Sequence, residues 1–133
     1  MEVSLEVSAV PDQSLIDLIG TRLAEFNQAD VGPANRLPLA VLVRADQRVV
    51  AGISGYTAWG WLYVQWLWVA EEFRGQGLAG RMLVAAENEA RHRTCHGAYI
   101  DTFNPAALKA YQRAGYRVFG ELPDFPQGRC GAS

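Results

Sequence analysis

The sequence predicts a mixed α/β fold, in which a central, mainly antiparallel sheet carries helices on both faces. Three observations support this fold class. Three consecutive strand-like segments are joined by short turns, and such short links allow only antiparallel neighbours. The third segment, Trp61–Val69, is apolar on both faces except for Gln65, as expected of a central strand that is covered on both sides. The second half of the chain then alternates helical and strand-like patterns.

Length and composition restrict the classes of protein that remain. The chain has 133 residues, 50% of them hydrophobic, and a formal net charge of -2. We find no repeat, linker or boundary, so residues 1–133 are predicted to form a single domain. The high apolar content excludes intrinsic disorder, and no run of Lys and Arg marks a nucleic-acid binder.

Nothing in the sequence predicts a membrane, secretory or metal-binding role. The most apolar stretch falls short of the roughly 20 residues of a membrane span, and Met1–Val10 lacks the pattern of a signal peptide. Cys95 and Cys130 have neither metal-ligand nor redox spacing, and reduced thiols are typical of the cytoplasm. The pair Cys95–His96 cannot close a tetrahedral site by itself, so no metal is expected. We therefore predict a cytoplasmic protein that binds neither nucleic acid nor membrane.

The first half of the chain is predicted to hold a strand, a helix and then three strands. Pro11 and Asp12 open the helix, whose apolar residues recur at helical spacing. In the last strand, strict alternation places Leu62, Val64, Trp66 and Trp68 on one face and Trp61, Tyr63, Leu67 and Val69 on the other. The five elements span Leu5–Val10, Ser14–Ala29, Leu39–Arg44, Arg48–Thr57 and Trp61–Val69.

The second half is predicted to alternate helices and strands. Asn104 at an N-cap and Pro105 at the first helical position mark one helix start, and Gly115 ends that helix. No periodicity is found in Pro123–Ser133. The predicted elements are a helix over Leu78–Arg93, a strand over Gly97–Phe103, a helix from Pro105 to Ala114 and a strand over Tyr116–Leu122.

A glycine-rich turn, Arg74–Arg81, joins the central strand to the long helix. The helix entrance lacks a Ser, Thr, Asp or Asn cap, so its first amides have no local acceptor, and such a site suits a diphosphate. The spacing Gly75-x-Gly77-x-x-Gly80 also matches the dinucleotide fingerprint, which makes a nucleotide-binding oxidoreductase one alternative. That fingerprint requires its first glycine at the strand end and a second nucleotide-binding half, whereas Ala70–Arg74 intervene here.

Two segments together resemble the GNAT acetyltransferase superfamily. Val69–Leu83 resembles its acetyl-CoA-binding segment, whose pattern Gln/Arg-x-x-Gly-x-Gly/Ala is met by Arg74, Gly77 and Ala79. Asn104–Tyr116 resembles its second motif, Asn-x-x-Ala-x-x-x-Tyr-x-x-x-Gly-Phe/Tyr. The resemblance covers Leu39–Leu122 and implies an N-acetyltransferase that moves an acetyl group from acetyl-CoA directly to a primary amine of a small molecule or peptide.

The resemblance also implies roles for individual residues. The Leu67 N–H would hold the developing oxyanion, Tyr111 would stand beside the sulfur as proton donor, and Asn104 would reach the pantetheine or acetyl region. Asn104, Leu108 and Tyr111 lie on one face of the predicted helix. The residues expected to contact acetyl-CoA are Leu67, Trp68, Val69, Arg74, Gly75, Gln76, Gly77, Leu78, Ala79, Gly80, Asn104 and Tyr111.

The sequence departs from the family in its candidate base. Many members carry a carboxylate on the central strand, but the corresponding residue here is Gln65, which cannot take up a proton. Asp101 on the next strand is the nearest alternative, while Glu71, Glu72 and His92 are weaker candidates. The missing carboxylate keeps open an alternative function, a catalytically weak acyl-CoA-binding or regulatory module of the same fold.

A second departure lies at the end of the chain. The GNAT fold usually closes with a further strand, which this sequence apparently lacks, so the Tyr116–Leu122 strand would be an exposed edge. Pairing with a second copy would cover that edge, and we therefore predict a homodimer. The acceptor amine is not identified. Its pocket is expected between the first helix and loop, Phe26–Leu37, and the turn around Trp59, where Trp59, Trp61 and Tyr63 offer aromatic walls.

Overall fold

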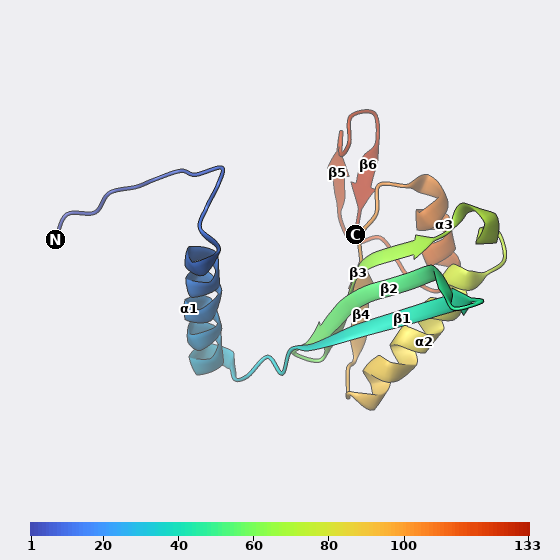
Figure 1. Ribbon diagram of the computed structural model, residues 1–133, viewed down its shortest axis with the longest axis horizontal. Helices are drawn as coiled ribbons and strands as arrows, with labels where there is room; N and C mark the ends of the chain where they lie inside the picture. The colour runs from blue at the N-terminus through green and yellow to red at the C-terminus, as the bar shows by residue number, and fades with distance from the viewer. The chain divides into compact units, whose positions relative to one another are not determined.

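The computed structural model describes all of residues 1–133 and divides into two compact units, Met1–Ala34 and Asn35–Ser133. The first unit contains helix α1 (Gln13–Val31). None of the helices combines the length and apolar character of a membrane span. The second unit contains β1 (Leu37–Ala45), β2 (Arg48–Ala58), β3 (Trp61–Val69), a 3-10 turn η1 (Glu71–Phe73), α2 (Leu78–His92), β4 (Gly97–Ile100), α3 (Pro105–Arg113), β5 (Glu121–Pro123) and β6 (Cys130–Ala132) (Figure 1).

Helix α1 begins where the sequence predicts. The Asp12 carboxylate caps it by accepting from the Ser14 N–H at 2.9 Å, and Gly32 ends it at a φ of 89°. Within its unit α1 buries no side chain. The predicted strand Leu5–Val10 is wrong for this structure, because residues 1–12 form no helix or strand. An extended segment becomes a strand only where a neighbour offers hydrogen-bond partners.

The main sheet has the strand order β1-β2-β3-β4 (Figure 1). Strands β1, β2 and β3 are antiparallel neighbours, as predicted, and β4 runs parallel to β3 after the crossover through α2. The predicted mixed α/β class with a mainly antiparallel sheet is therefore confirmed. The second unit, however, carries both of its helices, α2 and α3, on one face of the sheet rather than on both faces. Strand β4 ends at Ile100 rather than at Phe103, and its pairing with β3 stops at Val64–Ile100.

A β-bulge at Gln65 changes which side chains of β3 face the core. Ser54 pairs with Trp66 and the next residue, Gly55, pairs with Val64, so Gln65 has no partner on β2. A Cβ atom at position 55 would overlap the Tyr63 carbonyl, so this close approach of β2 and β3 requires glycine.

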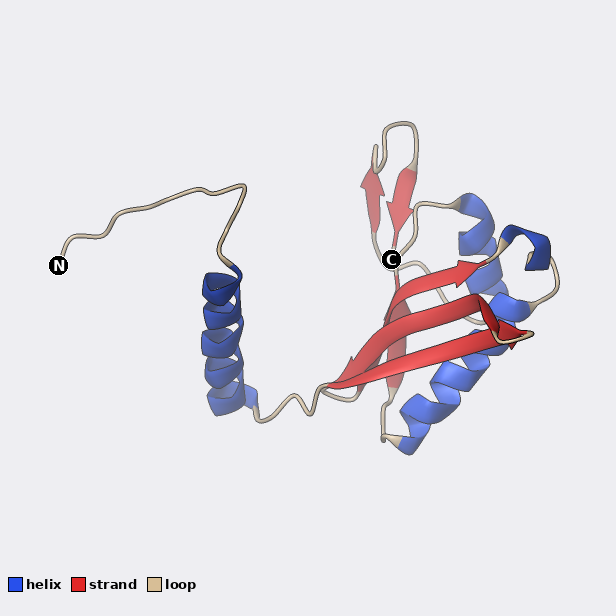
Figure 2. Ribbon diagram, viewed as in Figure 1, coloured by secondary structure: helices blue, strands red, loops and turns tan.

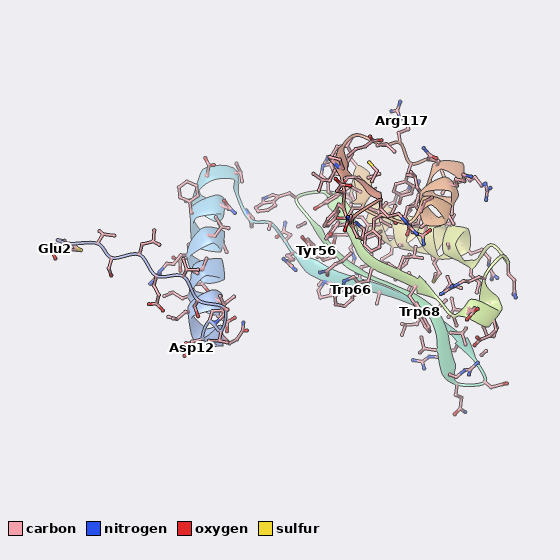
Figure 3. The ribbon with its side chains drawn as sticks, turned by 90° about the horizontal axis from the view of Figure 1, so that it is seen from above. Glu2, Asp12, Tyr56, Trp66, Trp68 and Arg117 are labelled. Atoms are coloured by element: carbon pink, nitrogen blue, oxygen red, sulfur yellow. The ribbon has the colours of Figure 1, made fainter.

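The predicted facing of β3 beyond the bulge is wrong, because the extra residue resets the alternation. Leu62 and Val64 are buried, and after the bulge Leu67 and Val69, rather than Trp66 and Trp68, pack against the same core. Trp66 is 67% exposed and Trp68 51%, and both lie along the side of the sheet that faces away from α2 and α3 (Figure 3).

The core of the second unit lies between the sheet and its two helices. Helix α2 packs against β1, β2 and β3, and α3 reaches the same cluster through Tyr111. Arg93 at the end of α2 donates to the Leu37 carbonyl and the Thr57 hydroxyl, both at 3.1 Å, which ties the helix to β1 and β2. The buried cluster comprises Leu39, Ala51, Ile53, Leu62, Val64, Met82, Leu83, Ala86, Ala90, Ile100 and Tyr111.

The end of the chain forms a hairpin that the sequence does not predict. Strand β5 is only Glu121–Pro123, shorter than the predicted Tyr116–Leu122, and it pairs with β6 of the same chain (Figure 2). Ala132 also exchanges two backbone hydrogen bonds with Thr102, of 2.9 and 2.8 Å. The expectation that the chain lacks a last strand is therefore wrong. Because β6 is three residues long and held by distant partners, it carries no periodic signal.

The two faces of the sheet should differ sharply in their contribution to stability. We expect Leu62→Ala to lower the free energy of unfolding by about 2–5 kcal/mol, because Leu62 is 0% exposed in the core. Leu42→Ala, at a leucine of β1 that is 55% exposed, is the matched control and should cost less than about 1 kcal/mol. Urea unfolding of both variants measures the difference, and equal costs would contradict the facing described above.

Candidate functional site

A groove opens where β3 and β4 stop pairing. Its volume is about 1390 Å³, and it runs between the end of β3, the glycine turn, the Ile100–Asn104 segment, α3 and the C-terminal hairpin. Every residue that the sequence predicts for the site lines this groove except Gln76. The groove thus brings together residues of the two resembling segments, which lie far apart in the chain.

The glycine turn presents a run of unpaired amides at one end of the groove. Arg81 is the first residue of α2 to donate a backbone hydrogen bond, to the Gly77 carbonyl at 3.1 Å. The amides of Gly75 to Gly80 find no acceptor in the protein, and Gly77 at the N-cap has no side chain to offer one. Unpaired amides at a helix N-terminus bind anions, so this turn is chemically suited to a diphosphate.

The space above these amides is open. A Cβ atom built at Gly77 or Gly80 meets no heavy atom within 4 Å. Gly77 has a φ of 79°, which favours glycine by itself, whereas the Gly80 backbone has no such positive φ. Backbone conformation therefore does not explain why a glycine stands at position 80. The absence of a side chain there leaves room for a ligand to reach the amides.

The groove-facing edge of β3 has backbone groups that no neighbouring strand pairs with. The Ala70 N–H donates to Val50 of β2 at 2.8 Å, so by alternation the backbone groups of Val69 and Leu67 point the other way, into the groove. The side chain of Arg74 confirms this direction, because its Nε donates to the Val69 carbonyl at 3.0 Å. An extended ligand arm could pair with this edge as an added strand would.

Helix α3 brings Asn104 and Tyr111 to the groove. The Asn104 side-chain oxygen caps the helix by accepting from Ala106 and Ala107 at 2.9 and 3.2 Å, which leaves its amide NH2 free to donate. Tyr111 is 6% exposed, and its ring belongs to the core. No hydrogen bond of its hydroxyl is formed within the protein, and Tyr111 lines the groove.

Asp101 follows directly after β4 and lines the groove with Gln65. Its carboxylate is exposed and takes part in no hydrogen bond or ion pair within the protein. Burial, and after it the negative charge of Asp101, raises the pKa of the Tyr111 hydroxyl and that of Tyr63. The negative charge of Asp101 therefore raises the pKa of one tyrosine on each side of the sheet.

The weaker candidates for a base lie elsewhere. Glu71, Glu72 and His92 do not line the groove, and Glu72 forms an exposed ion pair with Arg48 at 3.5 Å. No group of three or more His, Cys, Asp or Glu side chains is arranged to hold a metal ion. Asp101 is thus the predicted base candidate that the fold brings to the groove.

Sequence reasoning missed the contribution of the C-terminal hairpin to the groove. Phe125 and Gly131–Ser133 line it, and Phe125 packs edge-on against Phe103 with ring centroids 6.3 Å apart. Arg129 donates to the Phe103 carbonyl at 3.1 Å. No local pattern could have revealed these residues, because their place depends on contacts with a segment about 25 residues earlier in the chain.

Comparison with known proteins identifies relatives of this chain. The profile of the acetyltransferase (GNAT) family matches residues 13–116. An acetyltransferase of Agrobacterium fabrum is 44% identical over 124 residues, which cover 92% of this chain and 90% of that protein. A blasticidin-S acetyltransferase of Streptomyces morookaense is 40% identical over 81 residues, covering 60% of each chain.

A solved structure matches almost the whole chain. The crystal structure of a protein from Agrobacterium tumefaciens, assigned as an acetyltransferase, superposes with a TM-score of 0.92 at 41% sequence identity. The match covers 98% of this chain and 96% of that one. The fold is therefore shared with a protein that is assigned as an acetyltransferase.

The open space above the glycine turn leads to a direct test. We expect Gly80→Val to weaken acetyl-CoA binding at least tenfold, because the new side chain would fill the space that the diphosphate requires. Titration calorimetry with acetyl-CoA measures the affinity.

A matched control for backbone strain is available in the hairpin turn. Gly77→Val combines filling of the groove with strain at a φ of 79°, and Gly128 has the same φ and equally open space but does not line the groove. Gly128→Val should therefore retain acetyl-CoA affinity while Gly77→Val loses it. Wild-type affinity in folded Gly80→Val and Gly77→Val proteins would contradict the diphosphate site.

Proposed function

Because the chain belongs to the GNAT family of acetyltransferases, we propose that it transfers an acetyl group from acetyl-CoA directly to a primary amine of a small molecule or peptide. Acetyltransferase activity with acetyl-CoA as co-substrate follows from the family. The observation that carries the proposal is the groove itself, which combines an unpaired amide run, a free strand edge and the Tyr111 hydroxyl.

The residues of the groove fit the parts of acetyl-CoA. The amides of Gly75–Gly80 would hold the diphosphate, with Arg74 able to leave the Val69 carbonyl and add its positive charge. The backbone of Leu67 and Val69 would pair with the pantetheine arm, with Trp68 between them. The amide NH2 of Asn104 would donate to the same arm. Acetyl-CoA supplies an acetyl group activated as a thioester.

The chemistry requires two proton movements. The amine lone pair forms the new C–N bond as the C–S bond breaks, the amine gives up a proton, and the departing sulfur gains a hydrogen-bond donor or a proton. The Leu67 N–H, which points into the groove, would stabilise the negative charge that develops on the acetyl oxygen. Tyr111 would serve the sulfur, because its raised pKa keeps the hydroxyl protonated and therefore a donor.

Asp101 is the proposed acceptor for the proton of the amine. Its carboxylate takes part in no hydrogen bond or ion pair within the protein, and Asp101 lines the groove. An ammonium with a pKa near 10 is mostly protonated at neutral pH, and the carboxylate attracts it to the site. The ammonium first loses one proton to water, which frees the lone pair, and Asp101 then takes up the second proton, which the nitrogen loses as the C–N bond forms. Gln65 cannot perform this step, but its amide can orient the acceptor.

An acyl-CoA-binding module without activity remains the second candidate. The observation that favours it is Gln65 at the bulge, where a basic carboxylate is absent. The name of the blasticidin-S acetyltransferase relative supports a small-molecule acceptor and hence the enzyme.

Thiol release separates the two candidates. The purified chain is incubated with acetyl-CoA and a panel of primary amines that includes blasticidin S, and free CoA is measured. Release that depends on the amine supports the enzyme. If the chain binds acetyl-CoA but no amine in the panel increases thiol release, the module is favoured instead.

Replacing Tyr111 isolates the proposed donor. We expect Tyr111→Phe to lower kcat by about tenfold to a thousandfold with nearly unchanged acetyl-CoA affinity, because only the hydroxyl is lost. Since the pKa of Tyr111 is raised, the wild-type enzyme should keep this donor up to and beyond pH 10. Steady-state rates between pH 6 and 10 test both points.

The neighbouring tyrosine provides the control for this substitution. The Tyr116 hydroxyl donates to Glu87 at 2.9 Å and does not line the groove. Tyr116→Phe should therefore cost about 1 kcal/mol of stability and leave kcat unchanged. If Tyr111→Phe shows wild-type kcat where chemistry limits the rate, Tyr111 is a packing residue.

We further propose that residues 1–133 act as one acetyltransferase domain and that the protein is a cytoplasmic homodimer. The family match, residues 13–116, supports one domain because it spans both units. The free thiols of Cys95 and Cys130 support the cytoplasm.

The proposed dimer needs a different interface from the one predicted, because β6 of the same chain covers β5. Two large surfaces stay exposed in their own units. They are the apolar stripe of α1, which includes Leu15, Ile19 and Phe26, and the sheet face around Trp66 and Trp68. Sedimentation at micromolar concentration should give twice the mass of one chain, and a single-chain mass would exclude the dimer.

A further inference from the structure

Three tyrosines form a row across the sheet face that α2 and α3 do not cover. Tyr56 on β2 pairs with Tyr63 on β3, which in turn pairs with Tyr99 on β4. Each is flanked in its strand by residues of the opposite face, such as Leu62 beside Tyr63 and Ile100 beside Tyr99, both of which lie in the core. The three rings therefore project together from the open face.

The rings contact one another closely. Tyr63 and Tyr99 are stacked, with centroids 4.7 Å apart and an angle of 19° between their planes, and Tyr56 meets Tyr63 edge-on at 5.6 Å. Trp61 extends the row with its centroid 6.3 Å from that of Tyr99, and Arg36 covers the outer ring, 3.8 Å above Tyr56. Tyr99 is 37% exposed and Trp61 42%, so the second unit leaves the β4 end of the row uncovered and able to take a further ring.

This aromatic row lies next to the point where the reaction must occur. Tyr63 and Tyr99 are the pair just before Val64–Ile100, the last pair that joins β3 to β4. Beyond it the strands separate, with the unpaired bulge residue Gln65 on one side and Asp101 on the other. The groove thus borders the gap on one face of the sheet, and the tyrosine row lies beside it on the other. With acetyl-CoA in the groove, the tyrosine face is the side from which an acceptor can approach the gap without displacing it.

The Asp101 carboxylate lies close enough to the tyrosine row for one small ligand to contact both. Asp101 comes two residues after Tyr99, about 7 Å along an extended chain, a spacing that a ring and an amine joined by one or two carbons can bridge. Its charge is unpaired within the protein and acts on Tyr63 of the row and on Tyr111 of the groove. The protein thus presents one carboxylate, that of Asp101, beside a set of flat aromatic rings. This arrangement is complementary to a ligand that carries one ammonium group beside one flat ring.

From this juxtaposition we propose that Tyr63 and Tyr99, together with Asp101, bind the acceptor, and that the acceptor is a primary amine carried one or two carbons from a flat aromatic ring. The ring stacks against the exposed end of the tyrosine row, and the ammonium points to the Asp101 carboxylate at the gap. This inference rests on the proposed acetyltransferase function and adds the acceptor class to it.

A pair of amines that differ in flatness alone tests the proposal. The probes are 2-phenylethylamine and 2-cyclohexylethylamine, and the readout is kcat/KM for CoA release from acetyl-CoA. We expect the wild type to prefer the phenyl compound by about threefold to tenfold, the effect of one stacked ring. Tyr99→Leu should remove this preference, while Tyr99→Phe, which keeps the ring, should retain it.

Leu42→Ala supplies the control, because Leu42 is an exposed apolar residue of β1 outside the aromatic row and should leave the preference unchanged. Equal use of the two amines by the wild type would overturn the proposal. An equal loss for both amines in Tyr99→Leu, with normal acetyl-CoA affinity, would also overturn it, because the tyrosine would then support the sheet rather than the ring.

Failure of the proposed acetyltransferase function would give a different experimental result from failure of the proposed acceptor site. A chain that releases no CoA with any amine is not an acetyltransferase for amines, but binding of the two probes to the acetyl-CoA complex can still be compared by calorimetry. Tighter binding of the phenyl compound that is lost in Tyr99→Leu would support the ring site by itself. No difference between the two probes would overturn it.

Discussion

The close approach of β2 to β3 at Gly55 is the constraint on which the rest of the site depends. The Tyr63 carbonyl occupies the place of a Cβ atom at position 55, and directly beyond it Gln65 is inserted without a partner. A bulge bends its strand and adds twist, and β3 loses contact with β4 at this level. The separation of two parallel strands inside a sheet exposes backbone groups that would otherwise be paired.

Those exposed groups explain why the groove can accept an elongated ligand. The edge of β3 beyond the bulge offers the backbone groups of Leu67 and Val69, of which the Val69 carbonyl accepts from Arg74, and the turn that follows offers the amides of Gly75–Gly80. Both sets belong to one continuous stretch of chain, so one ligand can pair with the strand at one end and place its negative charge at the helix N-terminus at the other. Helix α3 and the C-terminal hairpin form the opposite wall.

The bulge also separates two kinds of surface on β3. The inward residues, such as Leu62 and Leu67, bind the sheet to α2, while the outward residues are mostly aromatic and exposed. A strand that is apolar on both faces can be buried twice, or it can use one face for packing and the other for a ligand or a partner. Here the outward rings sit beside the opening between β3 and β4, next to a carboxylate with no partner, which gives them a place in recognition.

The sequence by itself determined the features that arise from neighbouring residues. The start of α3 at Asn104-Pro105, the cap of α1 at Asp12 and the uncapped glycine turn all depend on side chains within a few positions, and each lies where the sequence predicts. Nearly every site residue that the sequence predicted also lines the groove, Gln76 being the exception. The tertiary structure decided what depends on distant pairing. The bulge that reverses the facing of Trp66 and Leu67 is a feature of the pairing between β2 and β3, next to their close approach at Gly55, and β6 is paired with β5 and with Thr102. The tyrosine row forms only when β2, β3 and β4 pair in the register that places Tyr56, Tyr63 and Tyr99 side by side. Local sequence does not predict this register, because it is set by the pairing between strands as the sheet forms.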